Sequence, residues 1–341
     1  MLKQPTKYEI KRRKLTFDML KDLYNLRALT VKQLSSRFKY SIRHMGRILR
    51  ELRADNLVIS EKVKGYNREK GHQGNYHRIS TKGIRYLNQA DFDTSRTADQ
   101  LRVNEYYLPY VLSVNDLVIN LEPHGWQVIG GRDTKIKYKM NRGDNIHGML
   151  ISPDGTRYGL YIFLNPVTQL NLNKIKKEVS RYKDFPNMLI LTKNEASFEQ
   201  VVWEFQHYND IVNYITFKVL PFGFAINYLI SLNTQAELMS FMEQFEVVHF
   251  PHADIETAPS DLQTIVIHED EEKYFVNMLC NDLTMLQKIR NYRKESYELD
   301  GRRVLVVTNM ENRYPEILED IHHIDYVDIR RDELADYFRS Y

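Results

Sequence analysis

The stretch TVKQLSSRFKYSIRHMGRILRELRADNLV, residues 30–58, contains two helix beginnings and the start of a strand. Thr30 and Gln33 have the spacing of a capping box, in which each side chain accepts the other's backbone N–H group at the first turn of a helix. Ser41 is a favourable N-cap for another helix, whose apolar residues recur at helical spacing: Ile42, Met45, Leu49 and Leu52. The stretch therefore predicts two consecutive helices joined by a short turn.

A further helix precedes this stretch, and a β-hairpin follows it. Apolar residues from Leu15 to Leu26 recur at helical spacing. Segments 57–63 and 76–79 are rich in β-forming residues and predict the two strands of a hairpin. A last helix is expected from Thr81 to Ala90. This order of helices and strands predicts a winged helix-turn-helix domain over residues 1–90.

Positive charge is concentrated in the same segment. Residues 1–90 hold 22 Lys and Arg against 7 Asp and Glu, whereas residues 91–341 hold 26 against 38. A basic segment attracts a polyanion through counterion release, and the acidic remainder argues against a chain that coats nucleic acid along its whole length. Double-stranded DNA is therefore the partner that the sequence predicts.

The candidate DNA-binding residues lie on the third helix and around the hairpin. Arg43, Arg47 and Arg50 share one side of that helix, where Gly46 would let a partner approach the backbone closely. Arginine binds guanine through two hydrogen bonds, which favours Arg43 and Arg47 for base contacts. A solvated helix face is the alternative interpretation of these charges. The candidate set, largely expected to contact phosphate, is completed by Lys39, Ser41, His44, Lys62, Lys64, Arg68, Lys70, His72 and Arg78.

The segment that follows the basic part differs in composition. Residues 91–104 are polar and poor in large apolar side chains, which predicts a linker. No stretch approaches a membrane span and no signal peptide is evident, so we expect a cytoplasmic protein without a membrane partner. The one cysteine, Cys280, fits a reducing compartment. Phosphate-loop and paired-cysteine motifs do not occur in the sequence, so no cofactor or metal is expected.

The acidic part contains an internal repeat. Met149–Tyr158 recurs 116 residues later as Ile265–Tyr274. Each copy then runs through a basic amphipathic helix into an apolar strand, and these strands end at Thr192 and Thr308, again 116 residues apart. Chance similarity of two apolar segments is the alternative explanation. The repeat predicts two related α/β units, at residues 105–215 and 216–341, and hence a pseudo-dimer.

The segments ALTVKQLSSRF, RILRELRADNLV and YHRISTKGIRYL resemble the bacterial replication-relaxation family. The resemblance covers residues 15–90 and extends over residues 105–200. Members of this family occur on plasmids and other mobile elements and are associated with plasmid replication and DNA relaxation. The resemblance implies a core like that of PD-(D/E)XK nucleases in the second segment, where two acidic residues hold a divalent cation that activates water.

Other residues occupy the acidic positions of that motif in this chain. His147-Gly148 stands where the first aspartate is expected, and 161–163 is apolar where the second carboxylate is expected. Asp154 belongs to a Pro-Asp-Gly sequence that is typical of a hairpin turn. In the second copy, Leu279 and Cys280 take the acidic strand positions. We therefore expect degenerate nuclease-like units with no catalytic or metal-binding residues.

Together these features predict an α+β protein, with a winged helix-turn-helix followed by two tandem α/β units. The expected function is sequence-specific binding of double-stranded DNA at an origin-type site, in replication initiation or in DNA relaxation and mobilisation. The second part would recruit a relaxase or a replication initiator, or form a homodimer. The alternative is a transcriptional regulator with an α/β oligomerisation domain, because nothing in residues 1–90 separates the two functions. An enzyme that nicks DNA is not expected.

Overall fold

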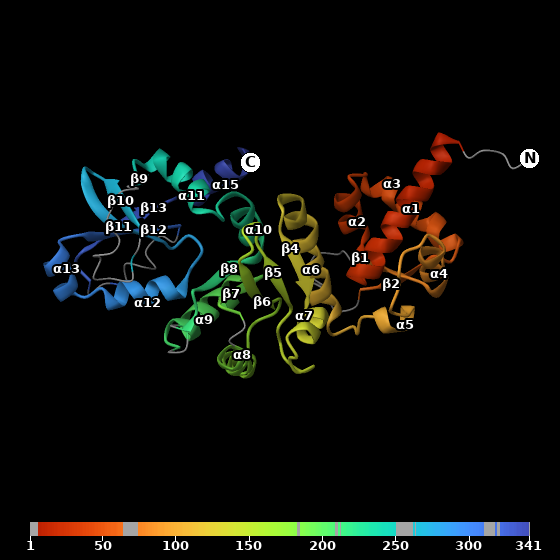
Figure 1. Cartoon of the computed structure of the whole chain (residues 1–341), viewed down its shortest axis with the longest axis horizontal. Helices are drawn as coiled ribbons and strands as arrows, with labels where there is room; N and C mark the ends of the chain where they lie inside the picture. Colours follow the sequence, from red (N-terminus) through yellow and green to blue (C-terminus); the bar gives the residue numbers. More distant parts are fainter. Residues whose placement is uncertain are drawn as a thin grey trace, which may run out of the picture. The chain divides into compact units, whose positions relative to one another are not determined.

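The computed structural model describes residues 6–63, 74–182, 185–208, 211, 213–249, 262, 264–309, 318 and 321–340. The described residues form three β-sheets with helices, which confirms the α+β part of the predicted fold class (Figure 1). The chain divides into two compact units, Met1–Pro123 and His124–Tyr341. No helix in the described part of the chain combines the length and apolar character that crossing a membrane requires.

The first unit combines helices with a three-stranded antiparallel sheet. Its elements are α1 (Lys7–Leu26), β1 (Leu29–Thr30), α2 (Val31–Phe38), α3 (Ile42–Ala54), β2 (Val58–Lys62), β3 (Asn75–Ile79), α4 (Thr81–Gln89), α5 (Ala98–Leu101) and α6 (Leu108–Leu121), followed by the 3-10 helix η2 (Glu122–His124). The strand order is β1-β3-β2, so the short β1 widens the β2–β3 hairpin. The helices and the hairpin expected between residues 15 and 90 are present.

Local side-chain contacts define the ends of α2 and α3. Gln33 N–H donates to Thr30 Oγ1 at 3.2 Å, and Thr30 N–H donates to Gln33 Oε1 at 2.9 Å, as the capping box predicts. α2 ends at Lys39, whose φ of 55° lies in the left-handed region. Ser41 Oγ then accepts the His44 N–H group at 3.2 Å and caps α3. The turn between the two helices is thus specified by the residues around it.

α6 belongs to the first unit. Gln33 Nε2 donates to the carbonyl of Leu112 at 2.7 Å, and Asn115 Nδ2 donates to the carbonyl of Ala28 at 2.6 Å. Ile119 lies in the core formed by α1–α4. The sequence placed a linker at residues 91–104 and a new unit from residue 105. In the structure this segment contains α5, and the first unit continues to Pro123 because α6 packs against α2 and β1.

The second unit contains two five-stranded sheets. The first sheet and its helices are β4 (Gln127–Gly130), α7 (Gly131–Lys137), β5 (Gly148–Ile151), β6 (Arg157–Phe163), α8 (Gln169–Arg181), β7 (Asn187–Thr192), α9 (Glu195–Gln206) and β8 (Thr216–Pro221). The remaining elements are α10 (Phe222–Ser231), α11 (Gln235–Met242), the 3-10 helix η4 (Glu243–Phe245), β9 (Val248–His249), β10 (Ile265–His268), β11 (Glu271–Asn277), α12 (Leu283–Asn291), α13 (Lys294–Asp300), β12 (Arg303–Thr308), β13 (Ile324–Asp328) and α15 (Arg331–Ser340).

The two sheets have the same topology. Their strand orders are β4-β5-β6-β7-β8 and β9-β10-β11-β12-β13, and in each the first three strands are antiparallel and the last three are parallel. A helical crossover, beginning with α8 or α12, joins the third strand to the fourth. The repeat is therefore visible in the topology. The first sheet extends through β8 to Pro221, past the boundary that the sequence placed at residue 215.

Strand pairing shifts the alignment of the two copies by one residue. Met149 pairs with Gly159, and Ile265 pairs with Tyr274. If Met149 corresponds to Ile265, then Tyr274 corresponds to Gly159, not to Tyr158 as the sequence comparison implied. Because neighbouring side chains of a strand point to opposite faces, Tyr158 and Tyr274 lie on opposite faces of their sheets. Tyr274 contributes to the main core of the unit, and Tyr158 does not.

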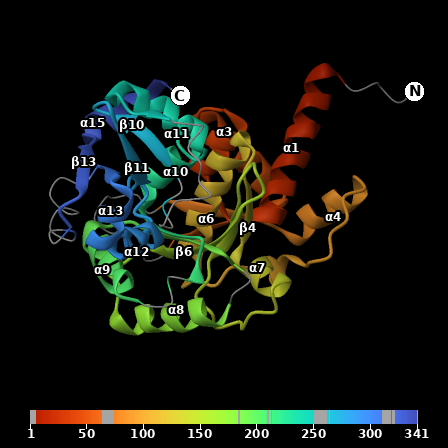
Figure 2. The same ribbon diagram turned by 60° about the vertical axis from the view of Figure 1, so that its left-hand side comes forward.

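The two copies share one apolar core. α12 packs against α9 and β8 (Figure 1), and Figure 2 also shows α12 beside α9. Phe217 N–H donates to Asp282 Oδ1 at 3.0 Å, and Val219 N–H donates to the carbonyl of Asn281 at 3.3 Å. These bonds join β8 of the first copy to the loop before α12 of the second. The pseudo-dimer is therefore a single compact unit.

Candidate nucleic-acid interface

α3 exposes a row of arginines. Its residues Met45, Leu49 and Leu52 are buried in the core of the first unit, whereas its basic side chains at positions 43, 47 and 50 are exposed. Ile42 was expected in the buried stripe, but it is 56% exposed because it lies in the first turn, away from the core. The helix therefore has one apolar and one cationic face.

Contacts along the helix surface orient the start of this cationic face. The His44 ring stacks on Tyr40 with 4.9 Å between ring centroids. Arg47 Nη2 lies 3.2 Å from His44 Nδ1. Glu51, the acidic residue of α3, pairs with Arg12 of α1 at 2.8 Å. Because Glu51 is paired with Arg12, it is less available to form ion pairs with the arginines of α3.

The beginning of α3 also suits an anion. Ser41 is exposed at the N-cap, and Lys39 is exposed in the turn before it. The N-terminal end of a helix carries partial positive charge and N–H groups that bind phosphate. We call the set Lys39, Ser41, Arg43, His44, Arg47 and Arg50 the α3 surface. The sequence identified every member of this set, and the structure brings them together on one end and face of α3.

Gly46 lies within the α3 surface and makes no close contact. A Cβ atom built on Gly46 would have no neighbour within 4 Å. Packing inside the described protein therefore does not require glycine at this position. The close approach of a partner, which the sequence suggested, stays a prediction.

The candidate DNA-binding residues of the hairpin differ in how readily they could contact a phosphate. Lys62 is exposed at the end of β2. Arg78 Nη2 lies 2.7 Å from Glu61 Oε1, and its side chain is only 13% exposed. Burial and the Glu61 carboxylate, which accepts the Tyr76 hydroxyl, raise the pKa of Tyr76 to about 12. A phosphate contact by Arg78 would therefore require breaking this ion pair. Four further candidates lie outside the described residues: Lys64, Arg68, Lys70 and His72.

In the second unit, the residues at the expected acidic positions have structural contacts. His147 Nδ1 accepts the N–H group of Ile162 at 2.9 Å, and burial together with Lys135 lowers the pKa of His147 to about 3. Tyr161 is buried and donates to Glu178 Oε2 at 3.1 Å. Asp154 accepts the Ser152 hydroxyl within the β5–β6 turn. Among the described residues, no group of three or more His, Cys, Asp or Glu side chains is placed to hold a metal.

The second copy requires a correction. Leu279 and Cys280 were expected at strand positions, but β11 ends at Asn277 and both residues lie in the loop before α12. Tyr161 and Val276 pair with corresponding residues of the next parallel strands, β7 and β12. Val276 is therefore the residue of β11 that corresponds to Tyr161. The sequence comparison therefore placed the end of this strand too far along the chain, and the one-residue shift in strand register accounts for only part of the difference.

Comparison with known proteins supports the resemblance seen in the sequence. No curated protein and no solved structure matches the chain significantly. The replication-relaxation family matches residues 20–201, a segment that runs from α1 into α9 and includes the α3 surface. This match spans more than half of the chain, which therefore belongs to the replication-relaxation family.

Proposed function

We propose that the protein binds double-stranded DNA through a winged helix-turn-helix made of α1–α4 and β1–β3. The DNA would be an origin-type site of a plasmid or other mobile element, in replication initiation or in DNA relaxation and mobilisation. Family membership supports a role in replication or relaxation of such elements. The order helix, strand, helix, helix, hairpin supports the domain assignment.

The α3 surface is the observation that carries this proposal. α2 packs against α3, the capped turn joins them, and the exposed arginines lie at one-turn spacing on the face away from the core. In a helix-turn-helix the second of these helices enters the major groove. Arg43 and Arg47 would contact base edges, while Lys39, Ser41 and Lys62 would contact phosphates.

The second unit would act without catalysis. Its apolar β6 and the backbone-bonded His147 occupy the positions where a nuclease needs carboxylates. The unit would recruit a relaxase or an initiator, or pair with a second copy of the chain. Supercoiled origin plasmid incubated with the protein and Mg²⁺ or Mn²⁺ should stay supercoiled. Reproducible nicking that is abolished by replacing one acidic residue would contradict this part of the proposal.

DNA recognition can be tested by fluorescence anisotropy on footprinted origin DNA and on random duplex. Arg47→Ala should weaken cognate binding by about 1–3 kcal/mol and relax preference at one base pair. Arg85→Ala, at an exposed position on α4, is the matched control and should bind like the unchanged protein. Equal losses of Arg47→Ala on cognate and random DNA would remove Arg47 from base recognition. Footprints that overlap a promoter instead of an origin would favour a transcriptional regulator.

A further inference from the structure

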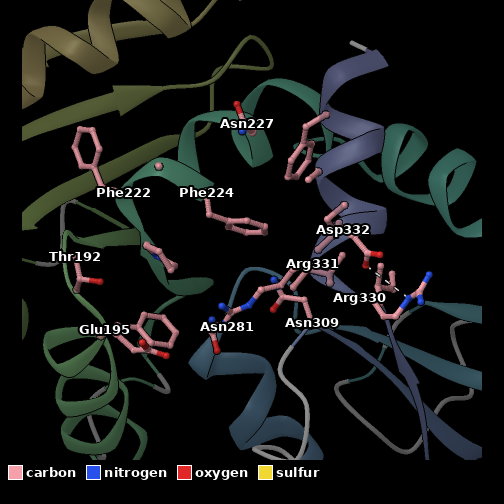
Figure 3. A pocket seen from close by; sticks show the side chains of 18 of the residues that line it. Thr192, Glu195, Phe222, Phe224, Asn227, Asn281, Asn309, Arg330, Arg331 and Asp332 are labelled. Carbon is pink, nitrogen blue, oxygen red and sulfur yellow. Dashed lines mark ion pairs between the residues drawn. The ribbon is translucent and has the colours of Figure 1, made fainter.

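A pocket of about 1610 Å³ lies in the second unit, at the carboxyl ends of strands from both copies (Figure 3). Thr192 ends β7 and Pro221 ends β8, while Asn309 and Ile329 directly follow β12 and β13. In open α/β sheets, ligands bind outside the carboxyl ends of parallel strands. The pseudo-dimer thus builds one pocket from four strand ends.

Three helices begin at this pocket. α9 starts after Asn194, and α15 starts at Arg331. α10 starts after Pro221 and has no side-chain cap among the described residues. Each helix has at least ten residues and carries partial positive charge at its N-terminal end. Acidic residues stand in the first turns of α9 and α15, whereas the first turn of α10 has none. N–H groups at such an end bind phosphate.

A buried hydroxyl in the pocket wall has no hydrogen-bond partner. Thr192 is 1% exposed, and its Oγ1 atom is unpaired in the structure. In Figure 3 this oxygen points from the end of β7 toward the pocket. A buried hydroxyl without a partner is unfavourable, because it has lost its bonds to water. A rotation about χ1 would present this hydroxyl to a polar ligand in the pocket, which would supply the missing partner.

Cationic and aromatic side chains complete the lining. Arg331 forms no ion pair with any described residue, and its side chain extends across the pocket toward Asn281 (Figure 3). Lys193 lies over the ring of Phe222, 4.9 Å from its centroid. Further phenyl rings line the pocket at Phe198, Phe224 and Phe338. The acidic lining residues Glu195 and Glu199 offer acceptors for sugar hydroxyls.

We propose that this pocket binds a nucleoside phosphate. The phosphate would lie at the start of α10 with Arg331, and the base would lie against the phenyl rings. The cavity is far larger than inorganic phosphate needs, since pockets that hold drug-sized ligands measure roughly 300–1,000 Å³. No phosphate-loop motif is involved, because the N–H donors come from separate helices. The site is independent of the α3 surface and of the DNA-binding proposal.

Calorimetric titration of the full chain tests the proposal. The probes are the 5′-mono- and triphosphates of adenosine and guanosine, the two nucleosides without phosphate, and inorganic phosphate alone. At least one nucleotide should bind at least about tenfold more tightly than its nucleoside and than inorganic phosphate. Arg331→Gln and Thr192→Val should each weaken that binding by about tenfold.

Two controls separate this site from other effects. Thr308→Val removes the corresponding buried hydroxyl at the end of β12, outside the pocket lining, and should bind nucleotide normally. The double change Arg43→Ala and Arg47→Ala on the α3 surface should also leave nucleotide binding unchanged. Arg331 is exposed, so Arg331→Gln stays informative even if Thr192→Val fails to fold. Absence of nucleotide binding at millimolar concentration, equal binding of nucleoside and nucleotide, or unchanged binding by Arg331→Gln would each overturn the proposal.

Discussion

Two histidines, the buried His77 and the half-buried His147, act as neutral hydrogen-bond partners. His147 Nδ1 accepts a backbone N–H group of β6, and burial is the main cause that lowers its pKa to about 3. His77 Nδ1 lies 2.6 Å from Ser60 Oγ, and burial with nearby Arg53 lowers its pKa to about 4. Both side chains are therefore neutral near neutral pH, and both must gain a proton when the protein unfolds in acid.

This gives a pH dependence of stability. An unfolded histidine has a pKa of about 6.5, so the unfolded state binds more protons than the folded state below that pH. The contribution of each neutral histidine to the free energy of unfolding is complete above about pH 6.5 and decreases as the pH drops toward the folded pKa. At pH 4 the loss is about 3 kcal/mol for each histidine. Urea unfolding between pH 7 and pH 4 measures this loss, which His147→Gln should reduce. An NMR titration that placed the pKa of His147 near 6.5 would contradict it.

At the scale of elements, α4 is held close to the hairpin by a glycine. A Cβ atom at Gly83 would lie 2.4 Å from the carbonyl oxygen of Leu57 and 2.7 Å from Ile79 Cγ1. The backbone carbonyl cannot move away without shifting the start of β2. Gly46 on α3 has open space instead. The two helical glycines therefore have different reasons for being glycine.

We expect Gly83→Ala to destabilise the first unit by about 1–3 kcal/mol through overpacking. Gly46→Ala is the matched comparison and should stabilise α3 by up to about 1 kcal/mol, because alanine is the better helix former. If DNA approaches α3 closely, Gly46→Ala should also weaken duplex binding. Urea unfolding and anisotropy separate the two effects. A Gly83→Ala protein as stable as the original would show that α4 can move away from β2.

Elements specified by local contacts were predictable from the sequence, and those specified by distant contacts were not. The Thr30 and Ser41 caps act within three residues, so α2 and α3 were expected with correct beginnings. The place of α6 depends on bonds from Gln33 to Leu112, far along the chain, which no local pattern reveals. The pocket draws on separate strand ends and helix beginnings, so no motif spacing indicated it.

At the scale of the whole molecule, the first compact unit is longer than the basic segment. Asn115 on α6 is buried and donates to the carbonyls of Leu26, the last residue of α1, and Ala28. Arg37 on α2 pairs with Glu122 at 2.6 Å. Removing α6 would expose the apolar side chains that pack against Ile119. It would also leave the carbonyl groups that Asn115 binds without this hydrogen-bond partner. The structure therefore places the folding unit at residues 1–123.

A fragment of residues 1–123 should unfold cooperatively, whereas a fragment of residues 1–90 should be less stable by several kcal/mol. Circular dichroism during urea unfolding of both fragments measures the difference. The comparison uses equal buffer and salt, because the basic fragment repels itself at low ionic strength. Equal midpoints for the two fragments would show that α6 adds nothing to the first unit.

The most direct test of the central claim is the salt dependence of duplex binding by the full chain. The slope of log affinity against log salt should be about −3, since each neutralised phosphate contributes about −0.9 and Lys39, Arg50 and Lys62 supply three cations for phosphate. Replacing Arg43, Arg47 and Arg50 together by alanine should flatten this slope and abolish preference for the origin. An affinity that does not change with salt, or no affinity for any duplex, would contradict the account.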